Sequence, residues 1–240
     1  MFDIEHLSES DKQFVLECVD YIHMNELDYI TETVLKSSDD ILYNKKKFDS
    51  GEINLVFITG FSGSGKSTLA KGIKANVIDM DKIIMYHDRN DKFFENEPKV
   101  VRDFINGPGK KYRISVEERN KIGTTKFDKM VIDDLLIFVT SYANSHKSEK
   151  FIMDGAWIFL FIEPSKLKNY AVYIKGTGVF TSASRASKRG SNGNDTSSKL
   201  SKILYTVKSF TRVSVNAVSG KLQKYIKYYG PLYEEQISSN

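Results

Sequence analysis

The sequence has 240 residues, 40% of them hydrophobic, and a formal net charge of +4, which fits one domain with a substantial core. The single cysteine, Cys18, excludes an internal disulfide, and the first residues lack the basic and then apolar pattern of a secretory signal. The longest apolar stretch, residues 151–162, is too short for a bilayer and predicts a buried strand. We therefore expect a cytoplasmic protein without membrane contact.

The N-terminal region carries a helical pattern. Ser10 and Gln13 have the spacing of a capping box, and apolar residues recur every four positions from Phe14 to Ile22. This pattern predicts an amphipathic helix that packs on the core or on a partner. We expect residues 1–50 to form a helical extension and residues 51–240 to form the main domain.

A glycine-rich segment follows the first strong strand signal. The strand INLVFITG leads into GFSGSGKSTLAKGIK, where Gly60, Gly65, Lys66 and Ser67 match the phosphate-binding pattern G-x-x-x-x-G-K-[ST]. Residues without a Cβ let backbone N–H groups surround a phosphate, and the following helix adds its positive end. We expect Lys66 to reach the β- and γ-phosphates and Ser67 to bind Mg²⁺. The predicted nucleotide site is formed by Gly60, Phe61, Ser62, Gly63, Ser64, Gly65, Lys66, Ser67 and Thr68.

Two acids end the next predicted strand, in the segment VIDMD. Asp79 and Asp81 are two positions apart, so on an extended strand both carboxylates point to the same side, next to the nucleotide. One acid would bind Mg²⁺ or its water, and the other would accept a proton from an attacking hydroxyl. The alternative is an acid pair at the start of the helix KIIMYH.

Strand and helix signals then alternate along the chain. Residues 86–125 read as an insert that covers an acceptor, and apolar spacing predicts a helix over residues 126–145. The strands KFIMDG and YAVYIKG follow, and the alternation predicts an α/β fold with a parallel, doubly wound sheet of about five strands, the fifth at 211–215.

Asp154 ends the buried strand KFIMDG. An acid in that place needs a partner, and a hydrated Mg²⁺ would supply one, so Ser67, Asp79 and Asp154 are the predicted metal ligands. A structural hydrogen bond to loop amides is the rival interpretation of Asp154.

The C-terminal part is basic. Between Pro164 and Pro231 the only acid is Asp195, whereas thirteen residues are lysine or arginine. This asymmetry fits either a polyanion-binding face or a solvated surface. The Ser/Gly/Asn-rich segment 181–199 reads as a lid.

Together, GFSGSGKST, VIDMD, FIMDG and the basic SRASKR resemble the P-loop kinases of small molecules, a group of P-loop NTPases that includes nucleoside, nucleotide, shikimate and gluconate kinases. More distantly, they resemble zeta-toxins and polynucleotide 5′-kinases. The resemblance covers about residues 53–215 and implies that Asp79 and Asp81 hold the acceptor or act as base. It also implies that Arg185 and Arg189 act from the lid. The N-terminal extension and the acceptor segment depart from the family pattern.

We expect an ATP- and Mg²⁺-dependent kinase that phosphorylates a hydroxyl or phosphate of a small molecule. The absence of a clear N-K-x-D segment favours ATP over GTP. One alternative is a polynucleotide 5′-kinase that stacks bases on aromatic residues of the basic C-terminal part, namely Tyr205, Phe210, Tyr225, Tyr228 and Tyr229. Another is a nucleotide-regulated binding protein without an acceptor. The sequence leaves open the acceptor, the choice of base between Asp79 and Asp81, and the oligomeric state.

Overall fold

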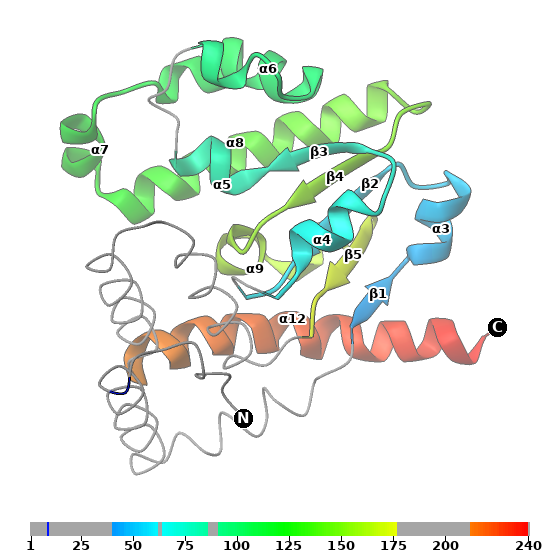
Figure 1. The fold of residues 1–240 in the computed structure, drawn as a ribbon. Helices are drawn as coiled ribbons and strands as arrows, with labels where there is room; N and C mark the ends of the chain where they lie inside the picture. Colours follow the sequence, from blue (N-terminus) through cyan, green and yellow to red (C-terminus); the bar gives the residue numbers. More distant parts are fainter. Residues whose placement is uncertain (1–8, 10–39, 62–63, 86–90, 177–211, 240) are drawn as a thin grey trace.

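The computed structural model describes residues 9, 40–61, 64–85, 91–176 and 212–239, arranged as Figure 1 shows. They form a mixed α/β fold in which helices flank a five-stranded sheet. The strands are β1 (Ile41–Tyr43), β2 (Leu55–Thr59), β3 (Asn76–Asp79), β4 (Phe151–Asp154) and β5 (Ala171–Ile174). The α-helices are α3 (Lys45–Ser50), α4 (Lys66–Lys71), α5 (Met80–Met85), α6 (Lys99–Asn106), α7 (Val116–Ile122), α8 (Thr124–Ser145), α9 (Trp157–Phe161) and α12 (Arg212–Ser238). The 3₁₀ helices are η1 (Asp91–Phe94), η2 (Pro108–Tyr112) and η3 (Pro164–Leu167).

The spatial order of the strands is β1-β5-β2-β4-β3. The strands β5, β2, β4 and β3 are parallel, so their carboxyl ends meet at one edge of the sheet, as expected. Strand β1 instead pairs antiparallel with β5, with Ile41 opposite Ile174, so the prediction of an all-parallel sheet is wrong. The short connection through α3 reverses the chain before β2, whereas parallel strands need a longer crossover.

The fifth strand therefore comes from the N-terminal side. Residues 41–50, which we expected in the helical extension, supply β1 and α3, and Phe48 of α3 is buried. The strand predicted at 211–215 is wrong, because α12 begins at Arg212. Its valines suggested a strand, but further along α12 Leu222, Tyr225 and Tyr229 recur at helical spacing and are buried. Burial of that helical face outweighs the local propensity.

The core lies on both faces of the sheet, because β2 is buried at every position. Leu55 and Phe57 contribute to a cluster that includes residues of α5, α6, α8, α9 and α12, whereas Val56 and Ile58 pack with residues of α3 and α4. Successive side chains of a strand point to opposite faces, so this division follows from the period of two. Figure 1 shows α3 and α4 on the opposite side of the sheet from α8 and α12.

The region between β3 and β4 is helical and packed. Helix α8 matches the helix predicted at 126–145, and its residues Phe127, Val131, Leu135 and Val139 are buried at the expected spacing. From residue 91 onward, the insert predicted at 86–125 forms η1, α6, η2 and α7. Val101 and Phe104 of α6 belong to the main core, so this part of the insert is built into the domain.

The apolar stretch 151–162 forms two elements instead of one strand. Strand β4 ends at Asp154, and α9 begins at Trp157 after a turn through Gly155. A Cβ on Gly155 would approach Cβ of Met80 to 3.0 Å, so the missing side chain lets the turn lie close to the start of α5.

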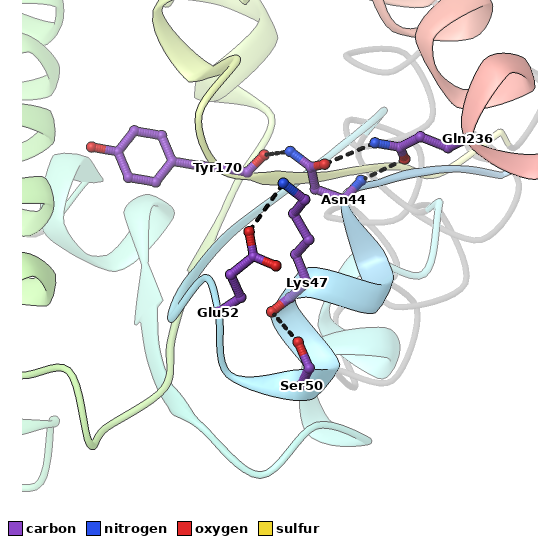
Figure 2. Close-up of polar contacts among 6 residues, drawn as sticks. All are labelled: Asn44, Lys47, Ser50, Glu52, Tyr170 and Gln236. Carbon is purple, nitrogen blue, oxygen red and sulfur yellow. Dashed lines mark hydrogen bonds and ion pairs between the residues drawn. The ribbon is translucent and has the colours of Figure 1, made fainter. Parts of the chain in front are cut away.

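The turn between β1 and α3 is joined to the end of α12 (Figure 2). Asn44 has a left-handed backbone with φ of 55°, a conformation that asparagine tolerates well. Its backbone N–H donates to Oε1 of Gln236 at 3.0 Å, and Nε2 of Gln236 donates to its Oδ1 at 2.8 Å. Its Nδ2 also donates to the carbonyl of Tyr170 at 3.2 Å. Nearby, Ser50 Oγ donates to the backbone carbonyl of Lys47. The ammonium group of Lys47 forms an ion pair with Glu52.

The helices predicted between residues 10 and 34 and the predicted lid at 181–199 lie outside the described residues. Of the helices that the structure describes, none combines the length and the apolar character that a membrane crossing requires.

Candidate functional site

The glycine-rich loop connects the carboxyl end of β2 to α4. Gly60 has a φ of 142°, and a Cβ there would lie 2.9 Å from the carbonyl oxygen of Lys175. Gly65 precedes α4 with a φ of 95°. Both glycines occupy backbone conformations that other residues rarely adopt, which explains why the loop has glycine at these two positions. Ser62 and Gly63 lie outside the described residues.

Both the side chain and the backbone carbonyl of Phe61 fix the position of the loop. Its buried ring meets Phe159 of α9 edge-on, with centroids 6.0 Å apart. Its carbonyl oxygen accepts the backbone N–H of Ser64 at 3.1 Å and Nζ of Lys66 at 2.9 Å. The Ser64 amide is therefore bonded within the loop, and the N–H of Thr68 donates to the carbonyl of Gly65. We expected the backbone N–H of Ser64 to face a phosphate, and in the structure it bonds within the loop instead.

Lys66 is only 8% exposed, although it carries a charge. Its ammonium group lies over the loop and interacts electrostatically with two carboxylates, Asp81 and Asp154, whose pKa values it lowers. The positive charge of Lys66 therefore lies at the carboxyl edge of the sheet, where ligands bind in parallel α/β sheets.

Asp154 at the end of β4 is the most buried acid of the site, at 6% exposure. The Ser67 hydroxyl donates to its Oδ2 at 3.1 Å. Its Oδ1 is buried and accepts no hydrogen bond from any residue that the structure describes. Burial raises the pKa of Asp154 to about 6, against the opposing effects of Lys66 and Ser67. Within the described residues, the rival interpretation of a bond to loop amides is therefore not supported.

Asp79 lies beside Asp154 at the end of the neighbouring strand, since the two residues are register partners in the β3–β4 pair. Its Oδ1 accepts the backbone N–H of Lys82 at 3.3 Å, so Asp79 caps the start of α5. The strand ends here, and Asp81 belongs to the first turn of α5. The predicted placement of both acids on one side of an extended strand is therefore wrong, and the alternative of an acid pair at a helix start describes the geometry.

Asp81 remains close to the other charged groups. Its Oδ1 accepts a hydrogen bond from Nε1 of Trp157 at 2.6 Å. Desolvation, followed by the charge of Asp79, raises the pKa of Asp81, whereas the indole N–H and Lys66 lower it. The residue as a whole is exposed, so solvent screening limits the effect of this shift on stability.

The structure thus brings together the residues that the motif and the two acid segments predicted. Lys66, Ser67, Asp79, Asp81 and Asp154 come from four elements and interact at the carboxyl edge of the sheet. Arg185 and Arg189 lie outside the described residues, so their role in the lid stays a prediction.

Ser67 and Asp154 fit a Mg²⁺ ion. Both offer oxygen ligands, and the buried Oδ1 of Asp154 lacks a donor within the described part of the chain. No group of three or more His, Cys, Asp or Glu residues in that part could hold a metal. Mg²⁺ does not require such a group, because it keeps several waters and commonly takes only one or two protein carboxylates. Asp79 stays a predicted ligand.

Sequence reasoning missed two contributors to this edge of the sheet. Trp157 was read as part of a strand, although Gly155 and the i, i+4 spacing of Trp157 and Phe161 signal a helix. The second contributor is the ion pair between Lys175, which follows β5, and Asp40. Asp40 also accepts the backbone N–H of Gly176 at 3.1 Å. No local pattern predicts this pairing of residues 135 positions apart.

Compared with protein-family models and with curated protein sequences, the chain matches none.

Proposed function

We propose that the protein is an ATP- and Mg²⁺-dependent phosphotransferase that transfers the γ-phosphoryl group to a hydroxyl or phosphate of a small molecule. The observation that carries the proposal is the environment of Asp154. Its carboxylate is buried beside Lys66, is bonded to the hydroxyl of Ser67 and keeps one oxygen without a donor among the described residues. A buried carboxylate with an oxygen that lacks a hydrogen-bond donor destabilises a fold unless a cation binds to it.

Each residue of the candidate site has a distinct role in this proposal. Lys66 would bind the phosphate oxygens of ATP, and Ser67 and Asp154 would hold Mg²⁺. When bound, the ion neutralises charge on the phosphates. Asp81 would accept the proton of the acceptor hydroxyl, since desolvation and the charge of Asp79 raise its pKa. Stabilisation of charge in a partly buried site supplies most of the catalysis in such reactions.

The test is a transfer assay. The purified protein is incubated with Mg²⁺, γ-labelled ATP and separate pools of nucleosides, nucleotides, sugars and oligonucleotides, and the label is followed into each pool. We expect one small-molecule pool to become labelled. Transfer into none of the pools would contradict the proposal.

Substitution of Lys66 separates the loop from general surface charge. We expect K66A to lower the transfer rate by about 100-fold or more, because the lysine neutralises charge that develops during transfer. The matched control is K71A, which removes the exposed lysine at the end of the same helix, α4, and should transfer at the wild-type rate. Equal rates for the two variants would contradict the role of Lys66.

The two alternatives have less support from the geometry. The rings of Tyr225 and Tyr229 are buried, and their hydroxyls donate to the backbone carbonyls of Ile162 and Pro164, at 2.7 Å in each case. Neither ring is available to stack on a base, which removes two of the five aromatic residues behind the nucleic-acid alternative. A nucleotide switch needs no proton acceptor, so D81A would leave such a protein unaffected and would inactivate a kinase.

A further inference from the structure

Trp157 joins the candidate site from outside the residues of the phosphate-binding motif. It begins α9 and is the only tryptophan of the sequence. Its Nε1 donates to Oδ1 of Asp81 at 2.6 Å, although the two residues are 76 positions apart. The bond therefore ties the start of α9 to the first turn of α5.

One ring contact and one close backbone approach position Trp157. The ring of Phe161, one helical turn later, stacks on Trp157 with centroids 5.7 Å apart and an interplanar angle of 21°. Two residues before Trp157, Gly155 lies so close to Met80 that a Cβ on the glycine would come within 3.0 Å of the methionine Cβ. The backbone before Trp157 is thus pressed against the residue that precedes Asp81.

The chemistry of indole suits it to hold a carboxylate that acts as a base. Its N–H is a donor only and does not titrate, so it can orient the carboxylate without competing for a proton. A hydrogen bond to one oxygen of Asp81 also leaves the second oxygen to accept the proton of an acceptor hydroxyl.

We infer that Trp157 is a positioning residue: its indole N–H holds Oδ1 of Asp81 and leaves Oδ2 to receive the proton during transfer. This inference rests on the proposed phosphotransferase function. In the transfer step, the acceptor oxygen forms a bond to the γ-phosphorus, the bond to the β-phosphate oxygen breaks, ADP leaves, and the acceptor proton moves to Asp81.

The first experiment tests the contact without any turnover. Protein labelled with ¹⁵N-tryptophan gives a single indole N–H signal, because the chain has one tryptophan. We expect this proton signal to lie downfield in the wild type, to move upfield in D81A and D81N, and to change little in D79N. An indole signal that is identical in wild type and both Asp81 variants would overturn the inference.

The second experiment tests the role in transfer, with γ-labelled ATP and the acceptor pool that the wild type labels. W157F keeps an aromatic ring for Phe161 but removes the donor, and we expect its kcat to fall about tenfold with the KM for ATP within about twofold. W157H restores a ring N–H and should recover part of the rate. F161L removes the stacking partner but keeps the indole donor, so its kcat should fall less than that of W157F.

The outcomes separate the inference from the function on which it rests. Wild-type rates in W157F, or an equal loss in F161L, would overturn the positioning role while transfer by the wild type still supports the kinase. If the wild type labels no pool, the proposed function fails and the role in transfer fails with it. The indole signal would then still decide whether Asp81 and Trp157 are bonded.

Discussion

Asp154 shows how a single buried carboxylate can oppose the stability of its own fold. The raised pKa means that the folded protein stabilises the protonated form of this buried carboxyl group relative to its charged form. Above the raised pKa, the protein must keep a charge in a place that favours the neutral acid. Near neutral pH, Asp154 therefore destabilises the fold, unless a bound cation compensates.

This argument gives a prediction with a defined sign. The pKa of Asp154 is about 6 in the folded protein and about 3.9 when unfolded, so its contribution lowers stability as pH rises from about 4 to about 6. D154N removes the charge and should be more stable than the wild type at pH 7.5, by about 3 kcal/mol at most. The difference should shrink toward zero near pH 4.

Urea unfolding in EDTA at both pH values measures this difference directly. Added Mg²⁺ and ATP should reverse the order, because they would stabilise the wild type but not D154N. A variant less stable than the wild type at pH 7.5 without Mg²⁺ would show that Asp154 has a structural role instead.

At the level of residues, the sequence was informative where a motif constrains the backbone. Gly60 and Gly65 were predictable, because the loop requires conformations that only glycine adopts easily. The bond between Trp157 and Asp81 was not predictable, because it depends on how closely α9 and α5 pack. Contacts between distant segments leave no periodic signal in either segment.

Secondary-structure elements were predictable where one strong pattern ran along the segment. Strands β2, β4 and β5 and helix α8 show it, because burial on both faces of a strand or on one face of a helix fixes the residue types. Helix α12 was missed. Two of its buried residues, Tyr225 and Tyr229, carry polar hydroxyls, which weaken the apolar pattern. These hydroxyls meet backbone carbonyls of α9 and η3 only in the folded protein.

Tyr229 gives a prediction for the packing of α12. Its hydroxyl donates to the carbonyl of Pro164 at 2.7 Å, and the residue is fully buried. Y229F should destabilise the protein by about 1 kcal/mol, because it removes a buried hydrogen bond to that carbonyl. The control is Y228F, whose ring is only partly buried in the same helix and whose substitution should cost less. Chemical denaturation compares both variants with the wild type, and equal costs would contradict the argument.

For the whole molecule, the described N-terminal strand and the C-terminal helix form one structural unit. Asn44, after β1, and Gln236, near the end of α12, are 192 positions apart and exchange two hydrogen bonds (Figure 2). These bonds form only when both segments are in place, so the two segments should be protected from exchange together.

Hydrogen exchange measured by mass spectrometry tests this coupling. N44A removes the side-chain bonds to Gln236 and Tyr170 and places alanine in a left-handed conformation, so it should cost about 2–3 kcal/mol. We expect faster exchange in both β1 and α12. S50A removes an exposed hydroxyl bond within α3 and should leave both segments unchanged. Faster exchange confined to one segment in N44A would show that they open independently.

The reversed direction of β1 has a topological result. Because β1 is antiparallel to β5, Asp40 just before β1 is bonded to Gly176 just after β5, and the neighbouring Lys175 lies close to Gly60 of the glycine-rich loop. The 39 residues before Asp40 and the segment that follows Gly176 are thus both covalently joined to the fold beside the candidate site. A spectroscopic label attached at either junction would test whether the proposed nucleotide binds there, without any change to the residues of the candidate site.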